Sequence, residues 1–89
     1  MGADRDAVVN WLHDWFARRG PLPDLPRAEW LDLDFFEAGL VDSFGIMELI
    51  TAIEQQFGVA FQAEHFERKS FFKLNGLADL IVQIQRGAV

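Results

Sequence analysis

The chain has 89 residues, of which 51% are hydrophobic and 25% are charged, and it contains no cysteine. This composition is typical of one small folded domain, and it excludes a disordered chain, a disulfide framework and a thiolate metal site. The net charge of −6 argues against nucleic-acid binding, because phosphates would be repelled.

The acidic charge is concentrated in the middle of the chain. Residues 24–57 hold eight acids and one base, a balance of −7, whereas the remainder holds six acids and seven bases, a balance of +1. Such a region attracts basic partners, although a soluble surface can also be acidic for no specific reason. No apolar run approaches the roughly 20 residues of a membrane span and no signal segment opens the chain, so we expect a cytoplasmic protein without membrane insertion.

A first helix is expected over about residues 4–19. Apolar side chains recur there at intervals of three and four, and Asp4 is placed to cap the first turn. The apolar face comprises Val8, Trp11, Leu12, Trp15 and Phe16. We expect Trp11, Trp15 and Trp30 to belong to the core rather than to a ligand cage.

Residues 20–42 are expected to form an ordered loop. Three prolines end the first helix, and the run RAEWLDLDFFEAGLV that follows is too apolar for a solvated linker. Its large side chains should therefore pack back onto the helices. Gly39 is expected to supply a backbone conformation that other residues avoid.

Three further helical segments follow this loop, and no strand pattern appears. A helix over about 43–57 ends at Gly58, a short helix covers about 64–67, and a last helix covers about 74–85. Together they predict a single all-α domain over residues 1–89, a small bundle of three main helices plus a short fourth.

Two details of the second half are less certain from the pattern. Lys73 occupies the position before the last helix, so Ser70 or Asn75 is expected to provide its cap. The phenylalanines Phe66, Phe71 and Phe72 suit either the core or an exposed docking surface, and the sequence leaves both open.

The helix over 43–57 begins in an unusual way for a helix selected only for stability. Asp42 and Ser43 can each cap a first turn, worth about 1 kcal/mol, but neither has the acidic or amide partner of a capping box three residues later. Gly45 in the first turn costs up to about 1 kcal/mol relative to alanine. Phe44 and Met47 are apolar residues on the outer face. Ser43 is therefore a candidate for chemistry, since a helix start tolerates an attached phosphate.

The segment DFFEAGLVDSFGIMELITAIEQQFGV resembles the phosphopantetheine attachment segment of acyl and peptidyl carrier proteins. The order Gly-Leu-Val-Asp-Ser-Phe-Gly, with two residues between Gly39 and Asp42, is most similar to the D-alanyl carrier branch. HFERKSFFKLNGLADLI is similar to that branch's lead into the last helix. The resemblance covers residues 34–81.

The resemblance implies a right-handed acyl-carrier-like bundle with 4′-phosphopantetheine attached covalently to Ser43. Asp42 would assist the phosphopantetheinyl transferase that attaches it. Partner enzymes would be contacted by the apolar Phe44 and Met47 and by the acids Glu48 and Glu54. The resemblance further implies a monomer without catalysis or metal of its own, served by an adenylating ligase or acyltransferase and by a downstream synthase or transferase.

The expected function is that of a free-standing acyl or aminoacyl carrier, which holds its cargo as a thioester on the arm. Arginine outnumbers lysine six to two, as in GC-rich genomes, so a role in secondary metabolism is preferred. A D-alanyl carrier for cell-envelope polymers is the first alternative. An unmodified helical interaction module is the second. The sequence names neither the cargo nor the pathway.

Several catalytic patterns fail on inspection. A nucleophile elbow around Ser43 would need a glycine where Val41 stands, and it would need a parallel sheet. His13 and His65 have no serine or orienting acid at a fixed spacing. The loop acids lack the alternating oxygens of a calcium loop.

Overall fold

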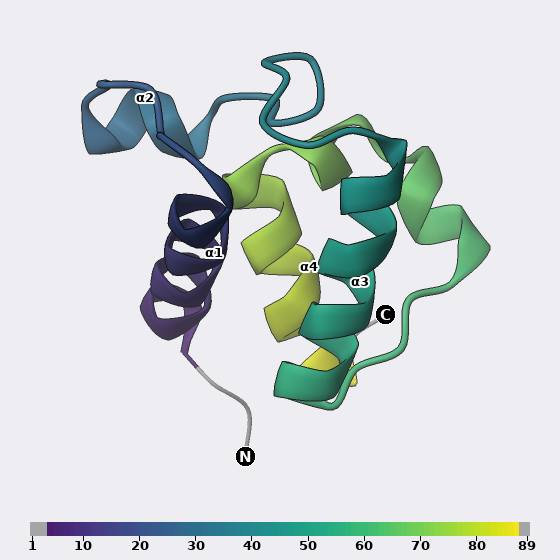
Figure 1. Ribbon diagram of the computed structural model, residues 1–89. Coiled ribbons are helices and arrows are strands. Elements are labelled where there is room, and N and C mark those ends of the chain that lie inside the picture. The colour runs from purple at the N-terminus through teal and green to yellow at the C-terminus, as the bar shows by residue number, and fades with distance from the viewer. Residues whose placement is uncertain (1–3, 88–89) are drawn as a thin grey trace.

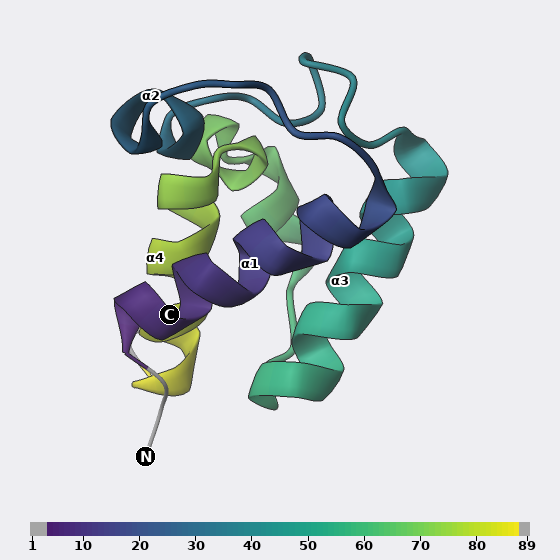
Figure 2. The ribbon, with the colours of Figure 1, turned by 60° about the vertical axis from the view of Figure 1, so that its left-hand side comes forward.

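The structure is a computed structural model that describes residues 4–87, and three long helices dominate it (Figure 1). They are α1 (Arg5–Arg19), α3 (Ser43–Phe57) and α4 (Leu74–Gln85), and between them lie α2 (Arg27–Leu31) and two 3-10 helices, η1 (Ala63–Glu67) and η2 (Lys69–Phe72). In Figure 1, α1 runs upward whereas α3 and α4 run downward, and Figure 2 shows that α1 crosses them obliquely. Residues 4–87 contain no strand, only an isolated bridge between Asp34 and Lys73. The all-α prediction is confirmed.

One core lies between the three long helices. It takes Leu49 and Ile53 from α3, while α1 and α4 contribute the larger share of buried side chains. The closest backbone approaches are those of α4 to α1 and to η2, and α3 stands further from α1. Within residues 4–87, no helix combines the length and the hydropathy that crossing a membrane requires.

The first helix begins as the sequence indicates but presents a narrower apolar face to the core. Asp4 Oδ1 accepts a hydrogen bond from the Ala7 amide at 2.8 Å. Trp30 is buried, with 5% of its surface exposed, as expected. Trp11 and Trp15 are only half-buried at the margin of the core, so their assignment to the core is wrong. The reason is that they lie on the side of α1 that faces α3, and a groove rather than close packing separates the two helices there.

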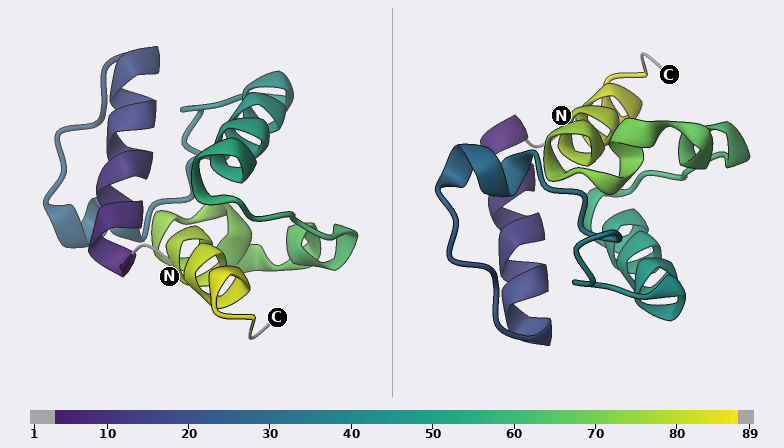
Figure 3. Two further views of the ribbon diagram at one scale, coloured as in Figure 1. Left: turned by 90° about the horizontal axis from the view of Figure 1, so that it is seen from below. Right: turned by 90° about the horizontal axis from the view of Figure 1, so that it is seen from above.

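The segment over residues 20–42 crosses the end of the bundle at which α3 and α4 begin (Figure 3). It is ordered but is not all loop, because α2 interrupts it and buries Trp30. Phe35 is fully buried, and its amide donates to the Phe72 carbonyl at 2.9 Å. Gly39 has φ of +77°, which confirms the conformation expected there. The missed helix has five residues, and the prolines that precede it mask so short a signal.

The region between α3 and α4 contains two 3-10 helices where the sequence indicated one short helix. Phe71 is buried, Phe72 is half-buried, and Phe66 is exposed at the surface. His65 is also buried, and its Nδ1 accepts a hydrogen bond from the Gln62 amide at 2.9 Å. These contacts give His65 a structural role and resolve the question left open for the three phenylalanines.

The start of α4 differs from the expectation that Ser70 or Asn75 caps it. No side chain caps this helix, and the Asn75 side chain instead accepts a hydrogen bond from Arg5 of α1 at 2.5 Å. Ser70 is occupied by a tight contact with Gly76. A β-carbon on Gly76 would overlap the Ser70 carbonyl oxygen. No local pattern encodes this close approach of η2 to α4.

The contact between Gly76 and Ser70 allows a test of the fold. Helix propensity and packing predict opposite changes in the free energy of unfolding when Gly76 is replaced. Gly76→Ala should gain up to about 1 kcal/mol from helix propensity, yet we expect a net loss of about 1–3 kcal/mol because η2 must move away from α4. Gly20→Ala is the matched control, since nothing lies within 4 Å of its added carbon and its backbone is extended. Urea unfolding of both variants measures the difference, and a stabilised Gly76→Ala variant would contradict the packing described here.

Candidate functional site

The first turn of α3 is capped by Asp42 and not by Ser43. Asp42 Oδ1 accepts a hydrogen bond from the Gly45 amide at 2.7 Å, and the Asp42 carbonyl accepts one from the Ile46 amide at 2.9 Å. The backbone of Asp42 is extended, as an N-cap residue requires. The aspartate alone therefore satisfies the capping need of this helix.

This arrangement leaves the Ser43 side chain without a structural task. Ser43 is exposed, and its hydroxyl makes no hydrogen bond to any residue in the range 4–87. Its neighbours on the outer surface, Phe44 and Met47, are 72% and 64% exposed, so nothing covers the hydroxyl. The positive end of the α3 dipole lies beside it and would stabilise an anion attached to the oxygen.

Gly45 explains the poor helix propensity of this turn. Its position is buried against the end of α1, and a β-carbon there would lie 3.1 Å from Arg19 Nη2 and 3.2 Å from Val41 Cβ. It would also lie 3.3 Å from Asp42 Oδ1, the atom that caps the helix. Glycine thus keeps room for the cap and for the Arg19 side chain, at the expense of about 1 kcal/mol of propensity.

The two acids expected to contact partner enzymes both have partners within the chain. Arg19 Nη1 pairs with Glu48 Oε2 at 2.8 Å, and the Arg19 guanidinium lies 4.7 Å from the centre of the Trp15 ring. Glu54 Oε2 accepts a hydrogen bond from the Phe61 amide at 3.0 Å. Contact of Glu48 and Glu54 with partner enzymes stays a prediction. A basic side chain of a partner would have to compete with Arg19 for Glu48 and with the Phe61 amide for Glu54.

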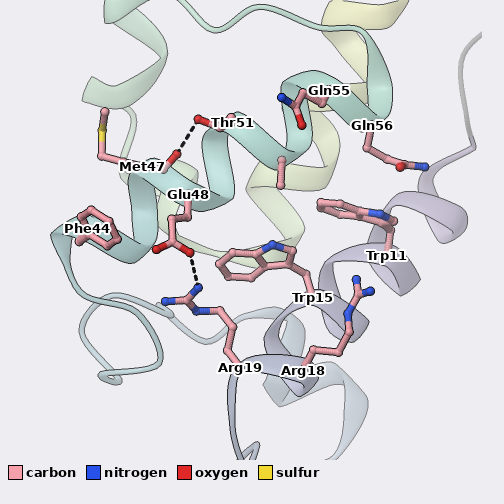
Figure 4. A pocket seen from close by; sticks show the side chains of 11 residues that line it. Trp11, Trp15, Arg18, Arg19, Phe44, Met47, Glu48, Thr51, Gln55 and Gln56 are labelled. Atoms are coloured by element: carbon pink, nitrogen blue, oxygen red, sulfur yellow. Dashed lines mark hydrogen bonds and ion pairs between the residues drawn. The ribbon is translucent and has the colours of Figure 1, made fainter.

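A groove separates α1 from α3 next to this site (Figure 4). It has a volume of about 870 Å³, and its walls are the Trp11 and Trp15 rings on one side and the outer face of α3 on the other. Phe44 and Met47 lie at the end nearest Ser43. The groove was not predicted, although the sequence has two tryptophans one helical turn apart and two apolar residues on the outer face after Ser43.

The structure brings together no second reactive centre in the range that it describes. His13 is exposed beside Asp14, and its ring centre lies 5.0 Å from that of Trp30. Between residues 4 and 87, no three histidine or acidic side chains are grouped as metal ligands would be. The Ser43 region therefore remains the candidate site.

Comparison with known proteins gives matches that include this site. Residues 22–81 match the family described as "Phosphopantetheine attachment site". A D-alanyl carrier protein of Lacticaseibacillus rhamnosus is 38% identical over 80 residues, which are 90% of this chain and 96% of that protein. This chain belongs to the phosphopantetheine carrier family, in its D-alanyl carrier branch.

Two further D-alanyl carrier proteins show the same relationship. The one from Streptococcus suis is 32% identical over 80 residues, 90% of this chain and 92% of that protein. The one from Bacillus velezensis is 35% identical over 54 residues, 61% of this chain and 69% of that protein. Membership implies a covalently bound 4′-phosphopantetheine, and a surface serine with an uncommitted hydroxyl at a helix start fits that group.

Measurements of the free energy of unfolding can show whether Asp42 alone, or Ser43 as well, caps α3. Asp42→Ala should cost about 1 kcal/mol, because the Gly45 amide loses its acceptor, whereas Asp42→Asn retains an acceptor oxygen and most of the stability. Ser43→Ala should change the free energy of unfolding by less than about 0.5 kcal/mol. Equal losses for Asp42→Ala and Ser43→Ala in urea unfolding would show that the serine also caps the helix.

Proposed function

We propose that Ser43 is the residue that carries 4′-phosphopantetheine. Its exposed hydroxyl, free of hydrogen bonds within residues 4–87, is the observation that carries this proposal. Attachment forms a bond between the Ser43 oxygen and the pyrophosphate phosphorus of coenzyme A that bears the pantetheine. The bond from that phosphorus to the bridging oxygen breaks, adenosine 3′,5′-bisphosphate leaves, and the hydroxyl proton passes to a base of the transferase. The attached group supplies a flexible arm whose terminal thiol holds the cargo as a thioester.

Asp42 is proposed to assist this modification in addition to its structural role. One carboxylate oxygen is bonded to the Gly45 amide, which fixes the orientation of the group beside Ser43. The other oxygen faces no hydrogen-bond donor within residues 4–87, and it is available to a metal ion held by the transferase. Phe44 and Met47 would provide the apolar contact with partner enzymes, which include the transferase, a loading ligase and a downstream transferase.

The proposed cargo is D-alanine. Each of the three relatives compared above has the name D-alanyl carrier protein, and two of those matches cover 90% of this chain. These findings favour the first alternative of the sequence analysis over a role in secondary metabolism. The excess of arginine over lysine is a property of overall composition, whereas the similarity includes the Asp42-Ser43 site itself. As a carrier, the chain would perform no reaction of its own.

Modification is tested by incubating the protein with a phosphopantetheinyl transferase of broad specificity and coenzyme A. Intact mass should increase by one phosphopantetheinyl group in the wild type and should not change in Ser43→Ala. Asp42→Asn should be modified more slowly than the wild type although its helix is still capped. A mass increase in Ser43→Ala would refute the attachment site, and no increase in any variant would support the unmodified interaction module.

The cargo is tested by loading the modified protein with purified adenylating ligases and ATP. A D-alanine-specific ligase from one of the relatives' species should attach one alanyl group, seen by intact mass and removed by hydroxylamine, which cleaves thioesters. L-Alanine and short fatty acids with their own ligases are the controls. Loading by those ligases and not by the D-alanine ligase would restore a role outside the D-alanyl pathway.

A further inference from the structure

The groove between α1 and α3 begins where the arm is attached. Its α3 wall runs from Phe44, the residue after Ser43, to Gln56. The twelve residue-to-residue steps between them, at a rise of 1.5 Å each, give a length of about 18 Å along the helix axis. A chain attached at Ser43 therefore starts at one end of a long surface depression.

The depression exists because α3 is not packed tightly against α1. The backbone of α1 lies close to α4 and not to α3. Side chains span the gap in its place, with the Arg19–Glu48 ion pair nearest the start of α3 and the Trp11 ring against Phe57 at the other end, 5.3 Å between ring centres. Between these two contacts the groove remains open to solvent (Figure 4).

The walls of the groove match the chemistry of a pantetheine chain. Pantetheine alternates apolar parts, a dimethyl-substituted carbon and methylene groups, with one hydroxyl and two amides. The groove offers Trp15 and Met47 to the apolar parts, and Gln55 and Arg18 to the amides. Arg18 donates only one weak bond within its own helix, from Nε to the Asp14 carbonyl at 3.3 Å, so most of its donors face outward.

We propose that the unloaded phosphopantetheine arm rests in the α1–α3 groove, with its chain against Trp11 and Trp15. This inference rests on the proposed attachment at Ser43. The phosphodiester would remain at the start of α3, beside the positive end of its dipole. The groove carries two guanidinium groups and one carboxylate, so it does not oppose the negative charge at the attachment point.

Because the arm is tethered to the protein, a groove that binds it only weakly is sufficient to hold it. A short flexible tether gives the arm an effective concentration of about 1 mM at nearby surfaces. A groove that binds free pantetheine with a Kd of about 0.3–1 mM would therefore hold the tethered arm for about half to three-quarters of the time. Such occupancy shields the thiol and still releases it readily to a partner enzyme.

The three tryptophans provide a readout that does not depend on activity. Trp11 and Trp15 line the groove, whereas Trp30 is buried outside it, with an indole Nε1 that has no hydrogen-bond partner within residues 4–87. Modification should shift the indole NMR signals of Trp11 and Trp15 and leave that of Trp30 in place. Cross-relaxation between the arm's methyl protons and the Trp15 ring should appear as well.

The outcomes separate this inference from the proposed function. Intact mass is recorded on the same sample, and if Ser43 gains no group both proposals fail. If the mass increases while the Trp11 and Trp15 signals stay unchanged, or all three tryptophan signals shift alike, the resting position is wrong and the attachment site stands.

A second experiment fills the groove without touching its tryptophans. Ala52 lies on the α3 wall, and Ala60 is exposed in the following loop outside the groove. The arm thiol of the wild type should react with iodoacetamide about two- to fourfold more slowly than free pantetheine. Ala52→Phe should abolish this protection, whereas the matched variant Ala60→Phe should retain it. Protection that is unchanged in a folded Ala52→Phe variant, or absent from the wild type, would overturn the inference.

Discussion

The hydrogen bond from the Gly45 amide to Asp42 Oδ1 is the interaction on which the site depends. This bond caps the first turn of α3 without using the Ser43 hydroxyl. Ser43 therefore lies at the helix start with its hydroxyl free of hydrogen bonds within residues 4–87. The same bond places a carboxylate beside Ser43 and favours a glycine, because a side chain at position 45 would crowd the capping oxygen and Arg19. The cap of α3 therefore comes from Asp42 and not from the adjacent Ser43.

Local patterns predicted the elements that carry their own signals. An aspartate caps both α1 and α3, and a left-handed glycine ends α3. Regular apolar stripes mark the helices, including α4, and all of these signals act over one or two turns. Ser43 and Asp42 could be singled out as candidates because a carrier motif is contiguous in sequence. The exposure of Phe44 and Met47 followed from the same periodicity.

The features that sequence reasoning missed are set by contacts between distant segments. No local signature marks the tight approach of Gly76 to Ser70, the Arg5–Asn75 hydrogen bond or the lack of close backbone contact between α1 and α3. The two tryptophans of α1 illustrate the limit. Their spacing indicates an apolar face, but only the distance to α3 decides whether that face becomes core or the wall of a groove.

The Arg19–Glu48 ion pair has a consequence for how a carrier can leave its partners. A cationic side chain that docked on Glu48 would compete with Arg19, so one charge contact would be exchanged for another with little net gain of free energy. The displaced guanidinium remains over Trp15 and can return as soon as the partner withdraws. If partner enzymes contact Glu48 as predicted, Arg19 is a competitor within the chain for that contact, a property suited to rapid hand-over between successive enzymes.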